Sequence, residues 1–149
     1  MLNKTDVDIL RNLQQDGRMT NAELAQKLDI APSAVLRRVR KLEESEIIEA
    51  YETRVNPVKT GLKMTTFIKV SSDEPLGELT AGEKMALLPE IMEVHFMAAD
   101  FCYLIKARVA DTDEHTALIK KLGKIKWIRD CQTLLVLQTL KETAQLNIQ

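Results

Sequence analysis

The chain has 149 residues, 45% of them hydrophobic and 29% charged, and its formal net charge is −1. This composition is that of a folded protein of one domain or two small ones rather than of a disordered chain. Because there is no long apolar run and the first residues are polar and acidic, we expect neither a membrane span nor a secretory signal, and we expect a cytoplasmic protein.

The first third of the chain predicts short helices with recognisable ends. A helix is expected over residues 3–16, with Asn3 able to cap its N-terminus and Gly17 as a stop signal. Thr20 and Glu23 have the spacing of a capping box, which predicts the start of a second short helix.

Pro32 fits the first position of a third helix, where its missing N–H costs nothing. At about 100° per residue, this helix has one apolar and one polar face. The apolar stripe contains Val35, Leu36, Val39 and Leu42. The opposite face contains Ser33, Arg37, Arg40 and Lys41, with Ala34 and Arg38 at its flanks.

The cations of this third helix form a local feature on a neutral background. Residues 1–60 contain ten Lys or Arg and ten Asp or Glu side chains, yet residues 37–41 contain four cations and no acid. The overall charge therefore gives no argument for nucleic-acid binding, but the local patch does.

Two short helices joined by a tight turn, with cations exposed on the second, are typical of a helix-turn-helix. Such a helix fits the major groove, where Arg and Lys reach phosphates or guanine. A solvated basic face is the alternative, but the capping box, the turn and the Pro-initiated helix favour DNA binding. The expected DNA-binding residues are Thr20, Asn21, Ser33, Ala34, Arg37, Arg38, Arg40 and Lys41.

These residues differ in their expected contacts. Ser33 and Arg37 are expected to approach bases, whereas the other three cations are expected to hold phosphates. Thr20 and Asn21 lie at a helix N-terminus, where backbone N–H groups can contact phosphate.

From Met64 onward, strands and helices alternate. Strands are predicted at 64–72, 91–98, 101–109 and 130–140, and helices at 78–88 and 113–122. The order βαββαβ is that of a ferredoxin-like sandwich, so the chain as a whole is predicted to be α+β.

The last predicted strand is apolar on both faces. Leu135 and Leu137 alternate with Leu134 and Val136. Because an antiparallel sheet with one solvated face would alternate with polar residues, the second face is expected to be covered by another subunit.

Residues 2–51 resemble the N-terminal domain of the Lrp/AsnC (feast/famine) transcriptional regulators. The shared elements are Leu2, Asp6, Ile9, Leu10, Leu13, Asp16, Gly17, Arg18, Glu23, Leu24, Ala25, Arg38, Val39, Leu42, Ile48 and Tyr51. The segment NPVKTG at 56–61 is similar to the family's hinge, and the similarity continues through nearly the whole chain.

The resemblance implies a three-helix (winged) helix-turn-helix domain at 1–50, a hinge strand or linker at 51–63, and a ferredoxin-like ligand-binding and oligomerisation domain at 64–149. Three positions depart from the family pattern. Asp29 and Glu46 stand where the family usually has Gly, and Ala31 stands where a capping Ser is common. These changes weaken local stability rather than the fold, since an absent cap typically costs ~1 kcal/mol.

In this family the second domain pairs into dimers, assembles them into octamers or similar rings, and binds amino-acid effectors. The effector loop usually reads Thr-Gly-Asp-Tyr-Asp-Tyr-Leu-Leu, and here residues 98–105 read Ala-Ala-Asp-Phe-Cys-Tyr-Leu-Ile. Ala99 replaces a glycine, and Cys102 replaces an aspartate suited to a ligand's ammonium group. An apolar or sulfur-bearing ligand, or none, therefore fits this loop. The effector-binding residues that the resemblance implies are Met97, Ala99, Asp100, Cys102 and Thr133.

The sequence gives no sign of catalysis. No nucleophile motif, phosphate loop or acid pair occurs, and His95 and His115 lack a third metal ligand in evident spacing. Cys102 and Cys131 are expected to be buried reduced thiols. We therefore expect no catalytic residue, no metal and no cofactor.

Three functions remain open. The first is an amino-acid-responsive regulator that binds double-stranded DNA as a homodimer or octamer, with half-sites about one helical turn apart. The second is a DNA-architectural protein that senses no ligand. The third is an enzyme similar to the sirohaem decarboxylases, which resemble this family, but the second domain is poor in the histidines that their chemistry uses.

Overall fold

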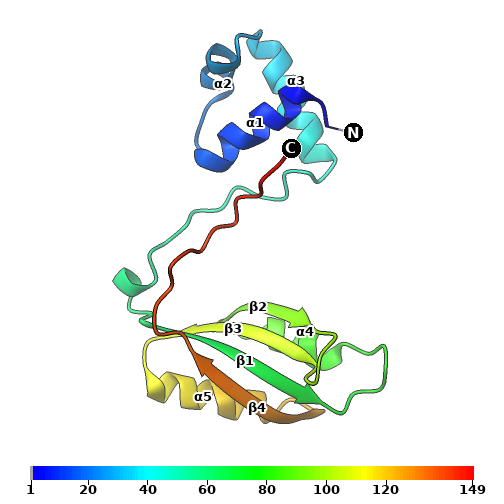
Figure 1. Ribbon diagram of the computed structural model, residues 1–149, viewed down its shortest axis with the longest axis vertical. Helices are drawn as coiled ribbons and strands as arrows, with labels where there is room; N and C mark the ends of the chain where they lie inside the picture. The colour runs from blue at the N-terminus through cyan, green and yellow to red at the C-terminus, as the bar shows by residue number, and fades with distance from the viewer. Residues whose placement is uncertain (1) are drawn as a thin grey trace. The chain divides into compact units, whose positions relative to one another are not determined.

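The computed structural model describes residues 2–149; Met1, the first residue of the expected DNA-binding domain, lies outside the described residues. The chain forms two compact units (Figure 1). The first contains residues 2–54 together with residues 141–149, and the second contains residues 55–140.

The first unit has three helices. They are α1 (Lys4–Gln15), α2 (Asn21–Leu28) and α3 (Pro32–Glu44). Both expected caps are present. The Asn3 Oδ1 accepts the Asp6 N–H at 3.0 Å, and the Thr20 Oγ1 accepts the Glu23 N–H at 3.2 Å, each with the reciprocal bond of a capping box.

Helix α3 begins at Pro32 as predicted, and its apolar side packs on the other two helices. The buried core of this unit is Ile9, Leu10, Leu24, Ala25, Val35, Val39 and Leu42. The prediction that Leu36 joins this stripe is wrong, because its side chain is 38% exposed.

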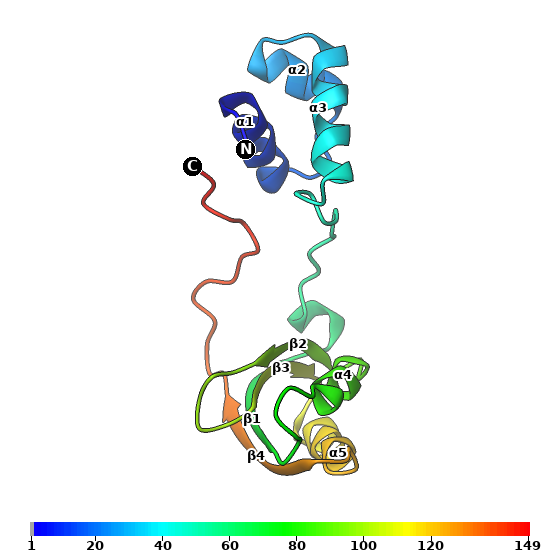
Figure 2. The same ribbon diagram turned by 90° about the vertical axis from the view of Figure 1, so that its right-hand side faces the viewer.

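The second unit is a four-stranded sheet with two helices. Its elements are η1 (Val58–Thr60), β1 (Met64–Ser72), α4 (Thr80–Ala86), β2 (Ile91–Phe96), β3 (Tyr103–Val109), α5 (Thr112–Leu122) and β4 (Ile128–Leu135). The strand order is β2-β3-β1-β4 and every neighbouring pair is antiparallel. Both helices cover the same face of the sheet (Figure 2). The α+β class and the ferredoxin-like sandwich are therefore confirmed.

The helix-covered face holds the second core, and one glycine controls its packing. Alternate residues of β1 and β3 are buried there, including Ile68, Ile105 and Tyr103. Gly82 in α4 is buried too, and a Cβ at this position would lie 2.6 Å from the Cε1 of Tyr103. Gly82 is thus required by the aromatic ring, although the sequence alone suggested only a weakened helix.

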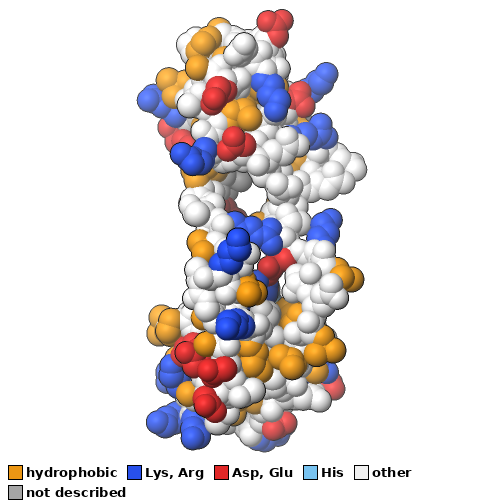
Figure 3. Space-filling view, turned by 90° about the vertical axis from the view of Figure 1, so that its left-hand side faces the viewer, with side chains coloured by type: hydrophobic (Ala, Val, Ile, Leu, Met, Phe, Trp, Pro, Cys, Tyr) orange, Lys and Arg blue, Asp and Glu red, His pale blue; other side chains and the backbone are white. Residues whose placement is uncertain are grey.

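The opposite sheet face has no helix over it within residues 2–149. By register, Phe67 lies between Lys106 and Leu134 on this face. Leu134 is 42% exposed, and Figure 3 shows hydrophobic side chains gathered on the surface of the second unit. Of the residues on which the two-sided hydrophobic pattern is based, Leu134 and Leu135 lie in β4, whereas Val136 and Leu137 follow its end.

The segments around the sheet differ from the expected boundaries. Between α3 and β1, the described chain has η1 and no strand, so residues 51–63 are a linker and form no paired hinge strand. Residues 141–149, expected in the second domain, group with the first unit because Ile148 packs against its core. No described helix combines the length and apolar character needed to cross a membrane.

Candidate DNA-binding surface and effector loop

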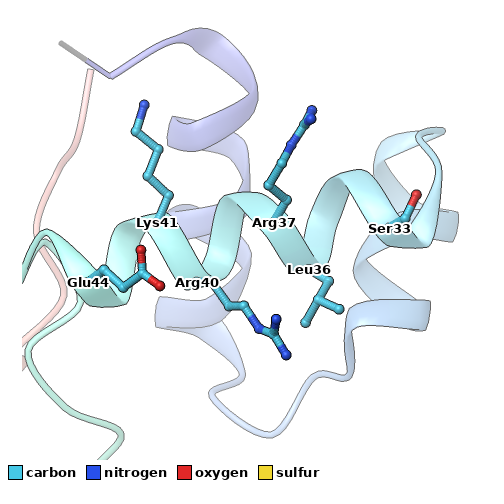
Figure 4. A pocket seen from close by; sticks show the side chains of 6 residues that line it. All are labelled: Ser33, Leu36, Arg37, Arg40, Lys41 and Glu44. Carbon is cyan, nitrogen blue, oxygen red and sulfur yellow. The ribbon is translucent and has the colours of Figure 1, made fainter.

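The outer face of α3 presents three cations, Arg37, Arg40 and Lys41, that form no hydrogen bond or ion pair within residues 2–149. A surface hollow there is lined by Ser33, Leu36, Arg37, Arg40, Lys41 and Glu44 (Figure 4). Arg37 and Lys41 extend to one side of the helix and Arg40 to the other. All three are exposed, and among residues 2–149 no ion pair or hydrogen bond is found for them. Their charges are therefore free to meet an anionic partner.

Arg38 behaves differently from its neighbours. Its Nη1 donates to the Asp6 Oδ1 at 2.7 Å and to the Asn3 Oδ1 at 3.3 Å, so it ties α3 to the start of α1. Its side chain is only 30% exposed. Arg38 was expected mainly to hold phosphate, but in the structure its guanidinium is bonded to Asp6 within the same unit. Helix periodicity could not reveal this pair, because the two residues are 32 positions apart.

The ion pair also sets the protonation of Asp6. Burial alone would raise the pKa of this carboxyl group. The hydrogen bonds from Arg38 and from the Asn3 backbone, together with the positive charges of Arg38 and Lys41, outweigh burial and hold the pKa below its ordinary value of 3.8. Asp6 is therefore a carboxylate at neutral pH and can pair with Arg38.

The start of α2 is used for capping. Thr20 donates through its hydroxyl to the Glu23 Oε2 at 2.8 Å and through its backbone N–H to the same oxygen at 2.7 Å. These two bonds lower the pKa of Glu23. The Thr20 side chain is thus occupied, while Asn21 and Ala34 are half-buried at the first turns of α2 and α3.

The turns on either side of α3 have left-handed residues. Asp29, between α2 and α3, has φ 53°, and Glu46, just after α3, has φ 56°. These are the two positions where glycine was expected from the resemblance, and the backbone keeps the glycine-like conformation without glycine. Ala31 provides no side-chain cap for α3.

A tyrosine after α3 fixes the exit of the helix. The Tyr51 hydroxyl donates to the Glu43 Oε1 at 2.8 Å. Burial, followed by this hydrogen bond and the negative charge of Glu43, raises the pKa of Tyr51 to about 12. The chain leaving α3 is thereby held against its last turn.

The predicted effector loop connects β2 to β3. The Met97 N–H donates to the Cys102 carbonyl at 2.8 Å, and the Cys102 N–H donates to the Val70 carbonyl at 3.0 Å. The Cys102 Sγ lies 3.4 Å from the Ser72 nitrogen and 3.3 Å from the Ser72 oxygen. Ala99 and Asp100 are exposed between these anchors. The thiol thus fastens the loop to β1.

Thr133, the fifth predicted effector residue, lies elsewhere on the sheet. It is paired with Ile68 on β1, whereas the loop joins β1 at Val70. Its Oγ1 is 3.0 Å from the Nε2 of His115 on α5. The structure therefore brings four of the five residues into one loop and gives Thr133 a histidine partner that sequence reasoning missed.

A carboxylate behind the loop was also missed. Glu74 accepts hydrogen bonds from the Tyr103 hydroxyl at 2.8 Å, the Ala81 N–H at 2.7 Å and the Ser72 hydroxyl at 3.2 Å. Burial, followed by the hydrogen bond to Glu74 and its negative charge, raises the pKa of Tyr103 to about 12. Because Ser72 also contacts Cys102, the hydrogen bonds of Glu74 connect the effector loop to β1, β3 and α4. The only sequence signal was an acidic residue shortly after a strand.

Neither half of the described chain gathers ligands for a metal. No group of three or more His, Cys, Asp or Glu side chains within residues 2–149 could hold a metal ion. Cys102 and Cys131 are half-buried free thiols, and burial followed by the charge of Asp130 raises the pKa of Cys131.

A helix-turn-helix with unengaged cations, joined to a ferredoxin-like domain, defines a DNA-binding regulator of two domains. Comparison with known families agrees. Residues 2–49 match the winged helix-turn-helix DNA-binding family, and residues 65–146 match the Lrp/AsnC ligand binding domain. The chain belongs to the Lrp/AsnC family of transcriptional regulators.

Individual relatives support the assignment over the full length. The leucine-responsive regulatory protein of Escherichia coli is 31% identical over 153 residues, which cover 99% of this chain and 92% of that protein. A transcriptional regulator of Neisseria meningitidis, solved with L-Met, has a TM-score of 0.92 and 29% identity, covering 98% of this chain and 96% of its own. A feast or famine regulatory protein of M. tuberculosis, complexed with L-methionine, has a TM-score of 0.91 and 26% identity, covering 98% and 99%.

Proposed function

We propose that this protein reads specific DNA sequences through α3 and changes that binding in response to an amino acid or a related small molecule. The observation that carries the DNA part is the set of three exposed cations without a hydrogen bond or ion pair in the described chain, Arg37, Arg40 and Lys41, on the outer face of α3. Arg37 lies nearest the N-terminal turns that approach base edges, whereas Arg40 and Lys41 suit phosphates. Such a protein acts on the chromosome in the cytoplasm as a regulator and not as an enzyme.

We further propose that the working form is a dimer or a higher assembly such as an octamer. One unit with so few free cations would bind weakly and lose affinity steeply with salt. The open, partly apolar sheet face around Phe67 and Leu134 supports pairing of two second units. Two recognition helices would then meet half-sites about one helical turn apart.

The effector is proposed to be an amino acid with an apolar or sulfur-containing side chain. Two structural relatives were solved with L-methionine. Here the loop is more apolar than the usual family loop, since Cys102 and Ala99 are neutral and small and Asp100 is its exposed carboxylate. The same two replacements favour the second candidate, a ligand-independent architectural protein.

A DNA-binding titration tests the first part. The full chain is titrated with the DNA upstream of its own gene at rising salt, and compared with Arg37→Ala/Arg40→Ala. The variant should bind more weakly, and its salt slope should fall by roughly 0.9 for each phosphate that it no longer neutralises. Arg38 is left in place because its removal would break the bond to Asp6 and confuse affinity with folding.

The matched control is Lys120→Ala/Lys124→Ala, which removes the same charge from exposed positions of the second unit. The control should bind as the wild type does. Equal binding by all three proteins would disprove the role of α3.

An amino-acid titration separates regulator from architectural protein. Each of the twenty amino acids is added while DNA affinity and oligomer size are followed. A response to methionine or another apolar amino acid supports the regulator, and Asp100→Asn should weaken it, because a carboxylate is the natural partner of the ligand's ammonium group. No response to any of the twenty would favour the ligand-independent function.

A further inference from the structure

The last nine residues form a docked segment of the first unit, called here the C-terminal strap (residues 141–149). The strap runs along α1, and both views place its final residues beside this helix (Figures 1 and 2). Terminal segments without helix or strand structure are ordinarily loose unless specific bonds hold them. Here such bonds are present.

Gln14, near the end of α1, holds the strap through a matched pair of hydrogen bonds. Its Oε1 accepts the Leu146 N–H at 2.6 Å, and its Nε2 donates to the Leu146 carbonyl at 3.1 Å. The same backbone is approached from the other side, because the Gln145 Nε2 donates to the Gln14 carbonyl at 2.7 Å. A side-chain amide that satisfies both polar groups of one peptide residue recognises an extended chain whatever its side chain is.

Two more contacts fix the strap on either side of Leu146. The Arg11 Nη2 donates to the Ile148 carbonyl at 2.9 Å, and the Ile148 side chain packs against the core of the helical unit. Towards the start of the strap, the Arg54 Nη2 lies 3.5 Å from the Glu142 Oε2. The strap is therefore anchored at several points.

Because the strap is docked on the helical unit, the chain connects this unit to the sheet domain twice. Strand β4 ends at Leu135, and only residues 136–140 separate it from the strap. Residues 55–63 make the other connection, between the helical unit and β1. The helical unit is thus connected to the sheet domain by two stretches of chain instead of one. Two short tethers allow fewer arrangements of the joined parts than a single tether allows.

We propose that the C-terminal strap is a positioning device for DNA binding and that Gln14 is its positioning residue. With the strap docked, each helical unit of an assembly stays within reach of its own half-site after the first unit has bound. With the strap released, the second binding event has a larger entropic cost, so affinity falls for paired half-sites and not for a single one. This inference rests on the proposed function, since it requires a protein that binds DNA.

The docking itself is tested by amide hydrogen exchange on the full chain. The Leu146 N–H should be protected in the wild type and exchange at least about tenfold faster in Gln14→Ala, because its acceptor is gone. Gln15→Ala is the matched control, since Gln15 is an exposed glutamine next along the same helix whose side chain makes no hydrogen bond within residues 2–149. Equal exchange in both variants would show that Gln14 does not hold the strap.

The positioning role is tested with two DNA duplexes, one with two half-sites and one with a single half-site. Gln14→Ala should bind the two-site duplex about tenfold more weakly and the one-site duplex within twofold of the wild type. Gln15→Ala should match the wild type on both. Equal losses on both duplexes would mean that Gln14 merely stabilises the helical unit, and no loss on either would overturn the proposal. If the wild type binds neither duplex, the DNA-binding function itself fails.

A truncation after Leu140 separates tethering from local packing. The truncated chain should lose the same two-site affinity as Gln14→Ala. A free peptide with the sequence of residues 141–149, KETAQLNIQ, can refill the surface of α1 but cannot restore the second tether. We expect the peptide to leave the two-site affinity low. Full recovery with the peptide would overturn the tether and leave only a packing role.

Discussion

Helices α2 and α3, the two halves of the helix-turn-helix, are stabilised in different ways. Helix α2 has a complete capping box at its N-terminus, formed by Thr20 and Glu23. Helix α3 has only a proline at its first position and no side-chain cap, and it is held by Val35, Val39 and Leu42 and by one ion pair from α1. Helix α2 is thus stabilised by residues at its own start, whereas α3 is stabilised by contacts with the rest of the unit.

The difference teaches which surface of the unit is available for function. Because α3 takes its stability from its inner face and from Arg38, its outer face is not required for folding. Arg37, Arg40 and Lys41 can therefore be selected for a partner alone. Substitutions that weaken or strengthen each source of stability should differ in size, and the largest effect is expected at the inner face of α3.

Leu42→Ala should cause the largest loss, because it opens a cavity beneath α3. Leu42 is 3% exposed, and truncation of a buried leucine costs about 2–5 kcal/mol. Leu36→Ala, on the same helix but 38% exposed, should cost well under half as much. Urea unfolding of the full chain compares the two, and equal costs would show that Leu36 belongs to the core after all.

Asp6→Asn should be next, because it leaves Arg38 without its carboxylate. Hydrogen bonds to charged groups contribute about 1.5–3 kcal/mol, so the free energy of unfolding should fall by an amount in this range near pH 7. Asp8→Asn is the control. Its pair with Arg11 spans 3.6 Å between exposed side chains, and such pairs contribute about 0–1 kcal/mol.

The same pair predicts a pH dependence. The pKa of Asp6 is lowered by folding, so its stabilising contribution is complete above the ordinary value of 3.8 and is lost as the pH falls through the lower folded value. Wild type and Asp6→Asn should therefore converge in stability in acid and diverge above about pH 4. A difference that stays constant far into acid would contradict the ion pair.

Thr20→Ala should cost ~1 kcal/mol, since it removes the acceptor for the Glu23 N–H and one donor to the Glu23 carboxylate. Thr20→Ser keeps the hydroxyl and should be nearly neutral. Thermal unfolding followed by circular dichroism measures both. A loss in Thr20→Ser as large as in Thr20→Ala would place the effect in the threonine methyl group.

Ala31→Ser should have the smallest effect and the opposite sign. Ala31 has φ −63° and ψ 139°, the extended conformation that a helix N-cap needs, so a serine hydroxyl could accept a first-turn N–H of α3. We expect a gain of about 0.5–1 kcal/mol. Ala31→Val, which has no acceptor, should give no gain, and a gain in both would exclude capping as the cause.

The features that could be predicted from the sequence are those that depend on residues close together in the chain. The N-cap at Asn3, the capping box at Thr20, the start at Pro32 and the order of strands and helices all follow from spacing and periodicity, and the structure has them. The outward direction of Arg37 and Lys41 is also a matter of helix geometry alone.

What sequence reasoning missed depends on contacts between distant residues. The Arg38–Asp6 pair, the bond between Thr133 and His115, and the strap on α1 each join positions that no periodic pattern relates. Leu36 was misplaced because it lies at the edge of the stripe, where the extent of the neighbouring helices and not the helix angle decides burial.

The two left-handed residues beside α3 determine how this domain can change. A non-glycine residue with positive φ has an unfavourable backbone conformation, whose free-energy cost the surrounding packing must offset. Substitutions at Asp29 and Glu46 that relieve this cost should therefore stabilise the domain. Replacement by glycine is compatible with the backbone at both positions, whereas a β-branched residue is not. The two turns that flank α3 can thus change towards glycine but not towards β-branched residues, and the outer face of α3 can vary independently of these turns.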